Sequence, residues 1–201
     1  MIKAIIFDFG NVICSFDNNI FLEKISMFTN KSIPELDKLI YRTSDLPKQY
    51  ETGLITSHEF FEKMAGLCGL NITKSEFTKF YAGIFTPIQT TFGLLKRLKP
   101  NYKLGLLSNT NEWDFEYGIK PIEVFHLFDA VSLSFVVKAM KPAKKIFTDA
   151  LAKLKLTPEE CVYIDDIKKY AEVANQIGIH GIHYTSYDAL VASLEKLGIR
   201  Y

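Results

Sequence analysis

The sequence predicts an α/β fold with a doubly wound, mostly parallel sheet and a helical cap inserted after the first strand. Its short apolar runs are continuous rather than alternating, which is typical of parallel strands buried on both faces. Amphipathic helical patterns separate most of these runs, and such alternation indicates a doubly wound sheet. One long stretch holds only helical patterns, and this stretch predicts the insertion.

Several apolar runs are predicted as parallel strands, namely Ala4–Phe7, Leu104–Leu107, Val162–Ile164 and Ile179–His183, with Ala130–Leu133 as a weaker fifth. Core helices are predicted where apolar residues recur at helical spacing, over Ile88–Leu98, Ala143–Leu154, Tyr170–Ile177 and Tyr187–Leu197. Such sheets bind ligands beyond the carboxyl ends of their strands. We therefore expect the site at the polar residues that follow three of these runs, which are Asp8, Ser108 and Asp165.

The insertion divides the chain into two predicted domains. An α/β core is expected over residues 1–15 and 87–201, and a helical cap over residues 16–86. Helical patterns in the cap cover Ile20–Phe28, Pro34–Tyr41, Ser57–Cys68 and Lys74–Phe85.

Two helix starts in the cap carry local signals. Ser57 is expected to be an N-cap, and Thr73 with Glu76 forms a possible capping box. We expect the cap to open and close about hinges near Ser15–Asn18 and Phe85–Pro87.

Composition limits the class of protein. Hydrophobic residues make up 48% of the 201 residues and charged residues 23%, as in ordinary globular proteins, which argues against disorder and coiled coils. The net charge of +1, without a basic stripe, argues against a nucleic-acid partner. The three cysteines lie far apart, which argues against a disulfide framework and against a zinc site.

The distribution of apolar residues predicts a cytoplasmic protein without a membrane partner. No apolar stretch approaches the ~20 residues that a bilayer span needs. The apolar run at the N-terminus is too short for a signal peptide and is interrupted by Asp8. The sequence leaves the oligomeric state open.

Asp8 ends the first predicted strand and is a candidate catalytic residue. A carboxylate in this position is costly unless it binds a cation or hydrogen-bond donors. An isolated aspartate at a strand end is more often the cap of a turn. The functional interpretation gains weight because three further polar elements follow in order along the chain.

The second and third elements carry groups that bind phosphate. Ser108 and Asn109 end an apolar strand, and they offer a hydroxyl and an amide that bond phosphate oxygens without adding charge. Lys141 precedes Pro142, which we expect at the first position of a helix, so that the ammonium lies at the positive helix end. A capped turn and a solvated lysine are the alternatives for these residues.

Asp165 and Asp166 form the fourth element and follow a buried strand. Adjacent carboxylates repel each other unless a cation or a donor lies between them. An oxygen-rich site with few protein ligands suits Mg²⁺, which keeps several waters. A pair of surface acids is the less favoured alternative after so apolar a run.

Together the four elements resemble the four motifs of the haloacid dehalogenase-like hydrolase superfamily, in the same order and over essentially the whole chain. The motifs are Asp8-Phe9-Gly10-Asn11-Val12, Ser108, Lys141 and Asp165-Asp166. The helical stretch resembles the cap of that family, on a Rossmann-like core. The Gly10-Asn11-Val12 run resembles a bacterial branch that includes sugar-phosphate phosphatases.

The resemblance implies a Mg²⁺-dependent phosphatase for a small phosphorylated metabolite, such as a sugar phosphate. Asp8 would be the nucleophile and would form an aspartyl-phosphate, with Ser108 and Lys141 as further catalytic residues. The implied metal ligands are Asp8, the carbonyl of Gly10, Asp166 and, through water, Asp165. The implied phosphate-binding groups are Ser108, Asn109, Lys141 and the backbone N–H groups of Phe9 and Gly10.

One departure from the family leaves alternatives open. Most of its phosphatases carry a general acid–base aspartate where this chain has Gly10. General acid–base catalysis contributes roughly 10²–10⁴-fold to the reaction rate. Asp17 lies close along the chain, and we expect it to be a cap or hinge residue first and a proton donor only second. The rival interpretations are a metal-independent 2-haloacid dehalogenase, a catalytically weak binding or regulatory protein, and a sugar-phosphate mutase.

Overall fold

The computed structural model describes residues 1–200, and its core is a five-stranded parallel sheet in the order β5-β4-β1-β6-β7. The strands are β1 (Ala4–Phe7), β4 (Lys103–Ser108), β5 (Ala130–Leu133), β6 (Cys161–Asp165) and β7 (His180–His183). All four pairings are parallel, with Phe7 opposite both Leu106 and Ile164. All five strands were predicted, with boundaries within a residue of those observed.

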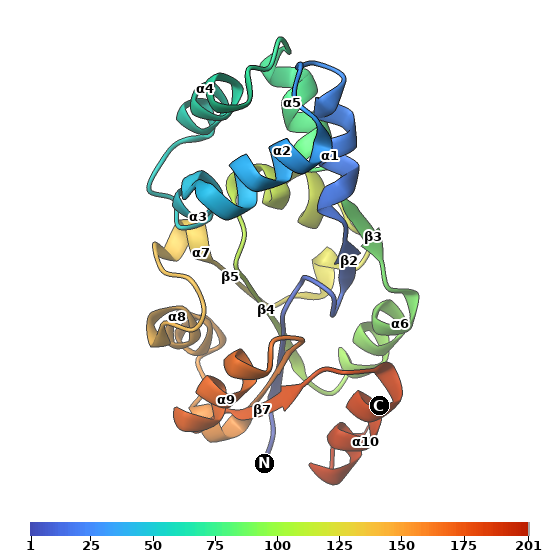
Figure 1. Cartoon of the computed structure of the whole chain (residues 1–201). Helices are drawn as coiled ribbons and strands as arrows, with labels where there is room; N and C mark the ends of the chain where they lie inside the picture. The colour runs from blue at the N-terminus through green and yellow to red at the C-terminus, as the bar shows by residue number, and fades with distance from the viewer. Residues whose placement is uncertain (201) are drawn as a thin grey trace.

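Helices cover both faces of the sheet (Figure 1). They are α6 (Gln89–Leu98) and α10 (Tyr187–Lys196) on one face, and α8 (Lys144–Leu154) and α9 (Lys168–Gln176) on the other. Alternate residues of β1 pack on the two faces of the sheet, because successive side chains of a strand point in opposite directions. Ile5 and Phe7 pack with α6 and α10, whereas Ala4 and Ile6 pack with α8 and α9. The predicted doubly wound, Rossmann-like fold is therefore confirmed.

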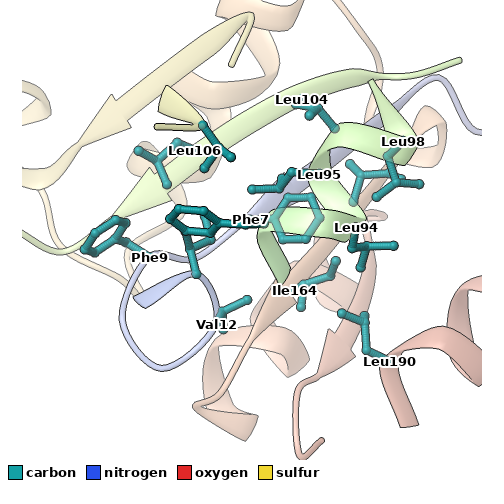
Figure 2. Packing of buried hydrophobic residues seen from close by; sticks show 14 of the residues in the cluster. Phe7, Phe9, Val12, Leu94, Leu95, Leu98, Leu104, Leu106, Ile164 and Leu190 are labelled. Atoms are coloured by element: carbon teal, nitrogen blue, oxygen red, sulfur yellow. The ribbon is translucent and has the colours of Figure 1, made fainter. Parts of the chain in front are cut away.

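The first of these two cores reaches the loop that follows β1. Figure 2 shows Phe7, Leu95 and Leu106 packed closely, with Phe9 and Val12 from the loop beside them. Burial of a large apolar side chain contributes roughly 1.5–3 kcal/mol. Packing on both sides of Asp8 thus fixes the loop against the sheet.

Five α-helices lie between two short strands that the sequence did not predict (Figure 1). The strands β2 (Cys14–Phe16) and β3 (Phe85–Pro87) pair antiparallel and connect the core with the helices. The helices, called the cap below, are α1 (Asn18–Ser26), α2 (Ile33–Asp37), α3 (Leu46–Glu51), α4 (Ser57–Cys68) and α5 (Lys74–Tyr81). Phe85 was expected to end a helix but lies in β3 instead, because its backbone pairs with that of Phe16.

The remaining elements are short. They are π-helices at Lys38–Thr43 and Asp114–Ile119, 3₁₀-helices at Phe125–Leu127 and Pro158–Glu160, and the helix α7 (Ser134–Val137). Among residues 1–200, no helix combines the length and the apolar character that a membrane crossing requires.

The cap has an aromatic core of its own that includes one residue from the α/β domain. Trp113, which follows β4, is 5% exposed and packs with the cap residues Phe60, Phe77 and Tyr81. Its ring centroid lies 5.9 Å from those of Phe60 and Phe77. Aromatic pairs at such distances contribute about 0.5–1.5 kcal/mol beyond the burial of area. The cap is therefore packed onto the loop after β4.

Local capping agrees with the sequence at one helix and differs at another. Thr73 and Glu76 form the predicted capping box of α5. The N-cap of α4 is Thr56, not Ser57, and Thr56 forms a capping box with Glu59. Ser57 is the first residue of the helix itself, and its hydroxyl bonds to Tyr50 at 2.7 Å and to the Glu112 carboxylate instead.

We expect Gly181→Ala to destabilise the fold, because the new Cβ would overlap the carbonyl oxygen of Ala171 and lie 2.9 Å from its carbon. Overpacking of this kind costs typically about 1–3 kcal/mol. Gly93→Ala is the control, since its exposed helical site has open space and should gain about 0.5–1 kcal/mol. Urea denaturation measures both variants, and equal stabilities would contradict the expected clash.

Candidate active site

Polar residues from three adjacent strands meet at the carboxyl edge of the sheet. Asp8 directly follows β1, whereas Ser108 and Asp165 are the last residues of β4 and β6. Because β1 lies between β4 and β6, parallel pairing brings these three residues to the same edge. All three are buried, with 7%, 3% and 0% of their surface exposed.

Lys141 points into this group of residues. Its Nζ lies 2.7 Å from Asp8 Oδ1 and 2.7 Å from Asp165 Oδ2, and the residue is 4% exposed. Burial lowers the pKa of Lys141, but the charges of Asp8 and Asp165 outweigh it and raise the pKa above its ordinary value. The alternative of a solvated lysine is wrong.

Asn109 positions the backbone of Lys141. The Asn109 Oδ1 accepts a hydrogen bond from the Lys141 N–H at 2.7 Å, and its Nδ2 donates to the Lys141 carbonyl at 3.3 Å. This bonding holds Lys141 in a turn, so α8 begins only at Lys144, with Ala143 as its extended N-cap. Pro142 is therefore not at the first helical position, and that expectation was wrong.

Three carboxylates come together around the ammonium. Oxygens of Asp8, Asp165 and Asp166 lie within 4.8 Å of one another. Asp166 is half-buried, and its Oδ2 accepts a hydrogen bond of 3.0 Å from Nδ2 of Asn11, which has a left-handed φ of 55°. Asparagine tolerates this backbone conformation. The sequence identified Asn11 as part of a motif but did not reveal that it orients Asp166.

The charges of this cluster do not balance. Burial raises the pKa of Asp8 to about 7; Lys141 opposes this rise, and Asp165 adds to it. Three carboxylates face one ammonium, so a further cation would relieve their repulsion. Carboxylate oxygens are the ligands that Mg²⁺ prefers, and the donor set fits that ion. The carbonyl of Gly10 belongs to the loop between Asp8 and Asn11.

Asp165 is held more tightly than the other two carboxylates. Its Oδ2 accepts a hydrogen bond from the Tyr163 hydroxyl besides the ion pair with Lys141. Its Oδ1 accepts one from the Ile167 N–H at 2.8 Å. These bonds occupy both oxygens, so the carboxylate is suited to orient neighbouring groups, as outer ligands of metal sites do.

A cavity of about 310 Å³ lies between this cluster and the cap. Phe9, Gly10, Ser108 and Asn109 line it on the core side, where phosphate binding was expected. The amide of Asn109 keeps a second hydrogen besides the one donated to Lys141. A ligand that reached Ser108 and Asn109 would extend into this cavity.

An aromatic ring covers Gly10. A Cβ at this position would lie 3.1 Å from Cε1 and 3.4 Å from Cδ1 of Phe16, which also lines the cavity. A side chain at position 10 would therefore be in tight contact with this ring. Asp17 caps α1, and its Oδ1 accepts a hydrogen bond of 2.9 Å from the Asn19 N–H.

Two acidic residues of the cavity wall were missed from the sequence. Glu51 ends α3, and Asp114 begins the π-helix after β4. Burial raises the pKa of Glu51 to about 7. Burial raises the pKa of Asp114 to about 8; a hydrogen bond from Asn111 opposes the rise, and the charge of Glu51 adds to it. No sequence motif marks these residues, since their burial depends on how the cap closes over the core.

The sequence and the structure both resemble known hydrolases. Residues 2–178 match the family model of haloacid dehalogenase-like hydrolases. The chain is 26% identical to D-ribitol-5-phosphate phosphatase of Bacteroides thetaiotaomicron, with 89% of each chain covered. It is 25% identical to a sesquiterpene phosphatase of Aspergillus oryzae, with 97% and 96% of the two chains covered.

A solved structure shares the fold and was determined with ligands. The HAD family enzyme bt-2542 of Bacteroides thetaiotaomicron, in complex with magnesium and inorganic phosphate, superposes with a TM-score of 0.78 at 26% identity. The alignment covers 89% of this chain and 92% of that one.

We expect Lys141→Met to destabilise the protein by about 3–5 kcal/mol, because it leaves two buried carboxylates without their cation. Urea denaturation at pH 7 in EDTA measures the loss, which should shrink at lower pH as the carboxylates gain protons. Lys144→Met removes an exposed lysine and should stay within about 0.5 kcal/mol of the wild type. Equal stabilities of the two variants would contradict the charge cluster.

We expect Asp114→Asn to become more stable relative to the wild type as the pH rises from about 4 to about 8. The folded pKa of about 8 lies above the ordinary 3.8, so the unfolded chain loses this proton first and the wild type loses stability across that window. A tenfold difference in acid dissociation constant between the two states corresponds to about 1.4 kcal/mol. Denaturation midpoints of both proteins at pH 5 and pH 8.5 measure the effect, and a constant difference would refute it.

Proposed function

The chain belongs to the haloacid dehalogenase-like hydrolase family, and on this premise we propose that it is a Mg²⁺-dependent phosphatase of a small phosphorylated metabolite. Asp8 is the nucleophile, and the reaction passes through an aspartyl-phosphate. The D-ribitol-5-phosphate phosphatase and the sesquiterpene phosphatase among its relatives support a phosphoric monoester as the substrate.

One observation supports the nucleophile most directly: the Asp8 carboxylate is ion-paired with a buried lysine beside a cavity. Lys141 lies 2.7 Å from Asp8 Oδ1 and orients it. Ser108 and Asn109 line the cavity next to Phe9 and Gly10, whose N–H groups complete the proposed phosphate cradle. Catalysis of phosphoryl transfer rests mainly on such positioning and electrostatics.

The proposed reaction has two displacement steps at phosphorus. An oxygen of Asp8 forms a bond to phosphorus while the bond to the leaving alcohol oxygen breaks, and that oxygen takes up a proton. A water molecule then attacks the phosphorus of the aspartyl-phosphate, releases inorganic phosphate and restores Asp8. The ammonium of Lys141 balances charge on the transferred phosphoryl oxygens and on Asp8 throughout.

Asp8, Asp166 and the Gly10 carbonyl are the proposed ligands of Mg²⁺, with Asp165 acting through water. The cluster of three carboxylates supports this assignment. When bound, the ion supplies charge neutralisation between the nucleophile and the phosphoryl group. Asn11 holds Asp166 for this role through its hydrogen bond of 3.0 Å.

Gly10 affects how the leaving alcohol obtains its proton. Gly10 has no side chain that could act as a general acid, so the alcohol oxygen takes its proton from water or from another cavity residue. Asp17 is engaged as a helix cap, which favours the structural role expected for it. A mutase needs an acid and a base to move protons both ways, so hydrolysis remains the better proposal.

The other rival functions are less well supported. A 2-haloacid dehalogenase needs no metal, whereas three clustered carboxylates favour a cation. A catalytically weak binding protein would not need Asp8 and Lys141 held together next to residues that line a cavity, such as Phe9. We further propose that residues 16–86 form the cap that selects the substrate. We also propose that the protein is cytoplasmic and has no nucleic-acid partner.

The proposal is tested with 4-nitrophenyl phosphate and Mg²⁺. We expect Asp8→Asn to lower kcat/KM on the order of 10³-fold or more, because an amide does not attack phosphorus. Asp188→Asn, an exposed site in α10, is the matched control and should keep wild-type rates. EDTA should abolish turnover and added Mg²⁺ should restore it. Wild-type rates in Asp8→Asn would exclude Asp8 as the nucleophile.

A further inference from the structure

Two acidic residues in the cavity wall are not among the groups assigned above to the chemistry at Asp8. Glu51 comes from the cap and Asp114 from the α/β core, and both line the same cavity as Ser108 and Asn109. A substrate with its phosphoryl group beside Asp8 would extend its leaving group into the cavity that these acids line.

Asp114 is buried with one oxygen unpaired. The residue is 9% exposed, and its Oδ2 accepts a hydrogen bond of 2.7 Å from Asn111. Its N–H donates to Asn111 Oδ1 at 3.0 Å. Within residues 1–200, Oδ1 has no hydrogen-bond partner. A buried acceptor left unpaired costs about 1–3 kcal/mol, so this oxygen favours a ligand that donates a hydrogen bond.

Glu51 is fixed by a contact between the cap and the core. The Ser134 hydroxyl bonds to the Glu51 carbonyl at 2.6 Å, and the Thr110 N–H donates to the same hydroxyl at 2.9 Å. No lysine or arginine lowers the pKa of Glu51 or Asp114 within the part of the chain that the structure describes. At a pH above their pKa values, about 7 for Glu51 and about 8 for Asp114, the two acids therefore give this wall a negative charge. Below those values each protonated carboxyl can donate as well as accept a hydrogen bond.

Phenol groups accompany the two acids. Tyr41 and Tyr81 line the cavity, and burial raises the pKa of both hydroxyls, with the charges of Asp114 and Glu51 adding to it. Both phenols stay protonated and can donate as well as accept hydrogen bonds. Tyr41 and Asp114 each lie in a π-helix, and π-helical turns are often found at functional sites.

We propose that Glu51 and Asp114 bind hydroxyl groups of the leaving alcohol, so that the substrate is a phosphorylated polyol or sugar without a second anionic group. The inference rests on the phosphatase proposed above and names the substrate class of that same site. A carboxyl group forms hydrogen bonds with hydroxyls in either protonation state, and its ionised form repels anions. The cavity of about 310 Å³ is at the small end of ligand sites, which disfavours a long isoprenoid chain.

The first test compares two leaving groups, with and without hydroxyls, on the full chain with Mg²⁺. We expect the wild type to prefer D-ribitol 5-phosphate to 4-nitrophenyl phosphate in kcat/KM. Glu51→Met should lower this ratio by about 10-fold or more, because sites built to bond hydroxyls discriminate strongly. Glu51→Gln keeps a hydrogen-bond acceptor and should restore part of the ratio. Glu62→Met, an exposed cap site, is the matched control, and equal ratios in both Met variants would overturn the proposal.

The second test concerns charge and uses 6-phosphogluconate, whose leaving group is anionic, at about pH 9, where the Asp114 carboxyl with its pKa of about 8 is ionised. Asp114→Asn keeps the acceptor for Asn111 but removes the charge. It should raise kcat/KM for 6-phosphogluconate relative to D-ribitol 5-phosphate by about 5-fold or more. An unchanged ratio would overturn the proposal. Should Glu51→Met fail to fold by circular dichroism, this second test decides.

The outcomes separate this inference from the proposed function. If the wild type hydrolyses no phosphoester, both fall. If it hydrolyses 4-nitrophenyl phosphate but prefers farnesyl phosphate, 6-phosphogluconate or phosphoethanolamine to every polyol and sugar phosphate, the phosphatase stands and the inference is overturned.

Discussion

The site depends on one buried ammonium that bridges two strand-end carboxylates. Lys141 contacts Asp8 and Asp165 at 2.7 Å each, and these acids come from neighbouring strands of the sheet. Like charges so close and so buried would destabilise the fold without a cation. The same pairing holds Asp8 beside the cavity, so the group that allows the cluster to fold also orients the proposed nucleophile. The remaining negative charge is what a metal ion would balance.

The loop after β4 positions residues that would contact both ends of the proposed substrate. Its first residue, Asn109, holds the backbone of Lys141, whereas Asn111 holds Asp114 in the cavity wall. Trp113 packs into the core of the cap. A change in this loop would therefore affect the phosphate site, the leaving-group wall and the contact between cap and core together. The position of the cap over Asp8 is set by side chains of the core domain.

Regular elements were the most predictable part of the fold, and short or tertiary features were the least. Continuous apolar runs identified every strand of the parallel sheet, because burial on both faces leaves a strong pattern. The strands β2 and β3 have three residues each, too few for any period to be seen. Ser57 was wrongly expected to be a cap: Thr56 takes that position one residue earlier, and the Ser57 hydroxyl bonds to Tyr50 and Glu112, which both lie outside its own helix.

The sequence by itself determined the order of the strands along the chain and the identity of the polar residues at their carboxyl ends. Those features follow from local composition and from the geometry of parallel sheets. The tertiary structure decided that Lys141 points inward, that Asn11 orients Asp166 and that Glu51 and Asp114 enter the cavity. Burial and side-chain direction arise from packing between distant segments, and no short stretch of sequence encodes which segments will meet.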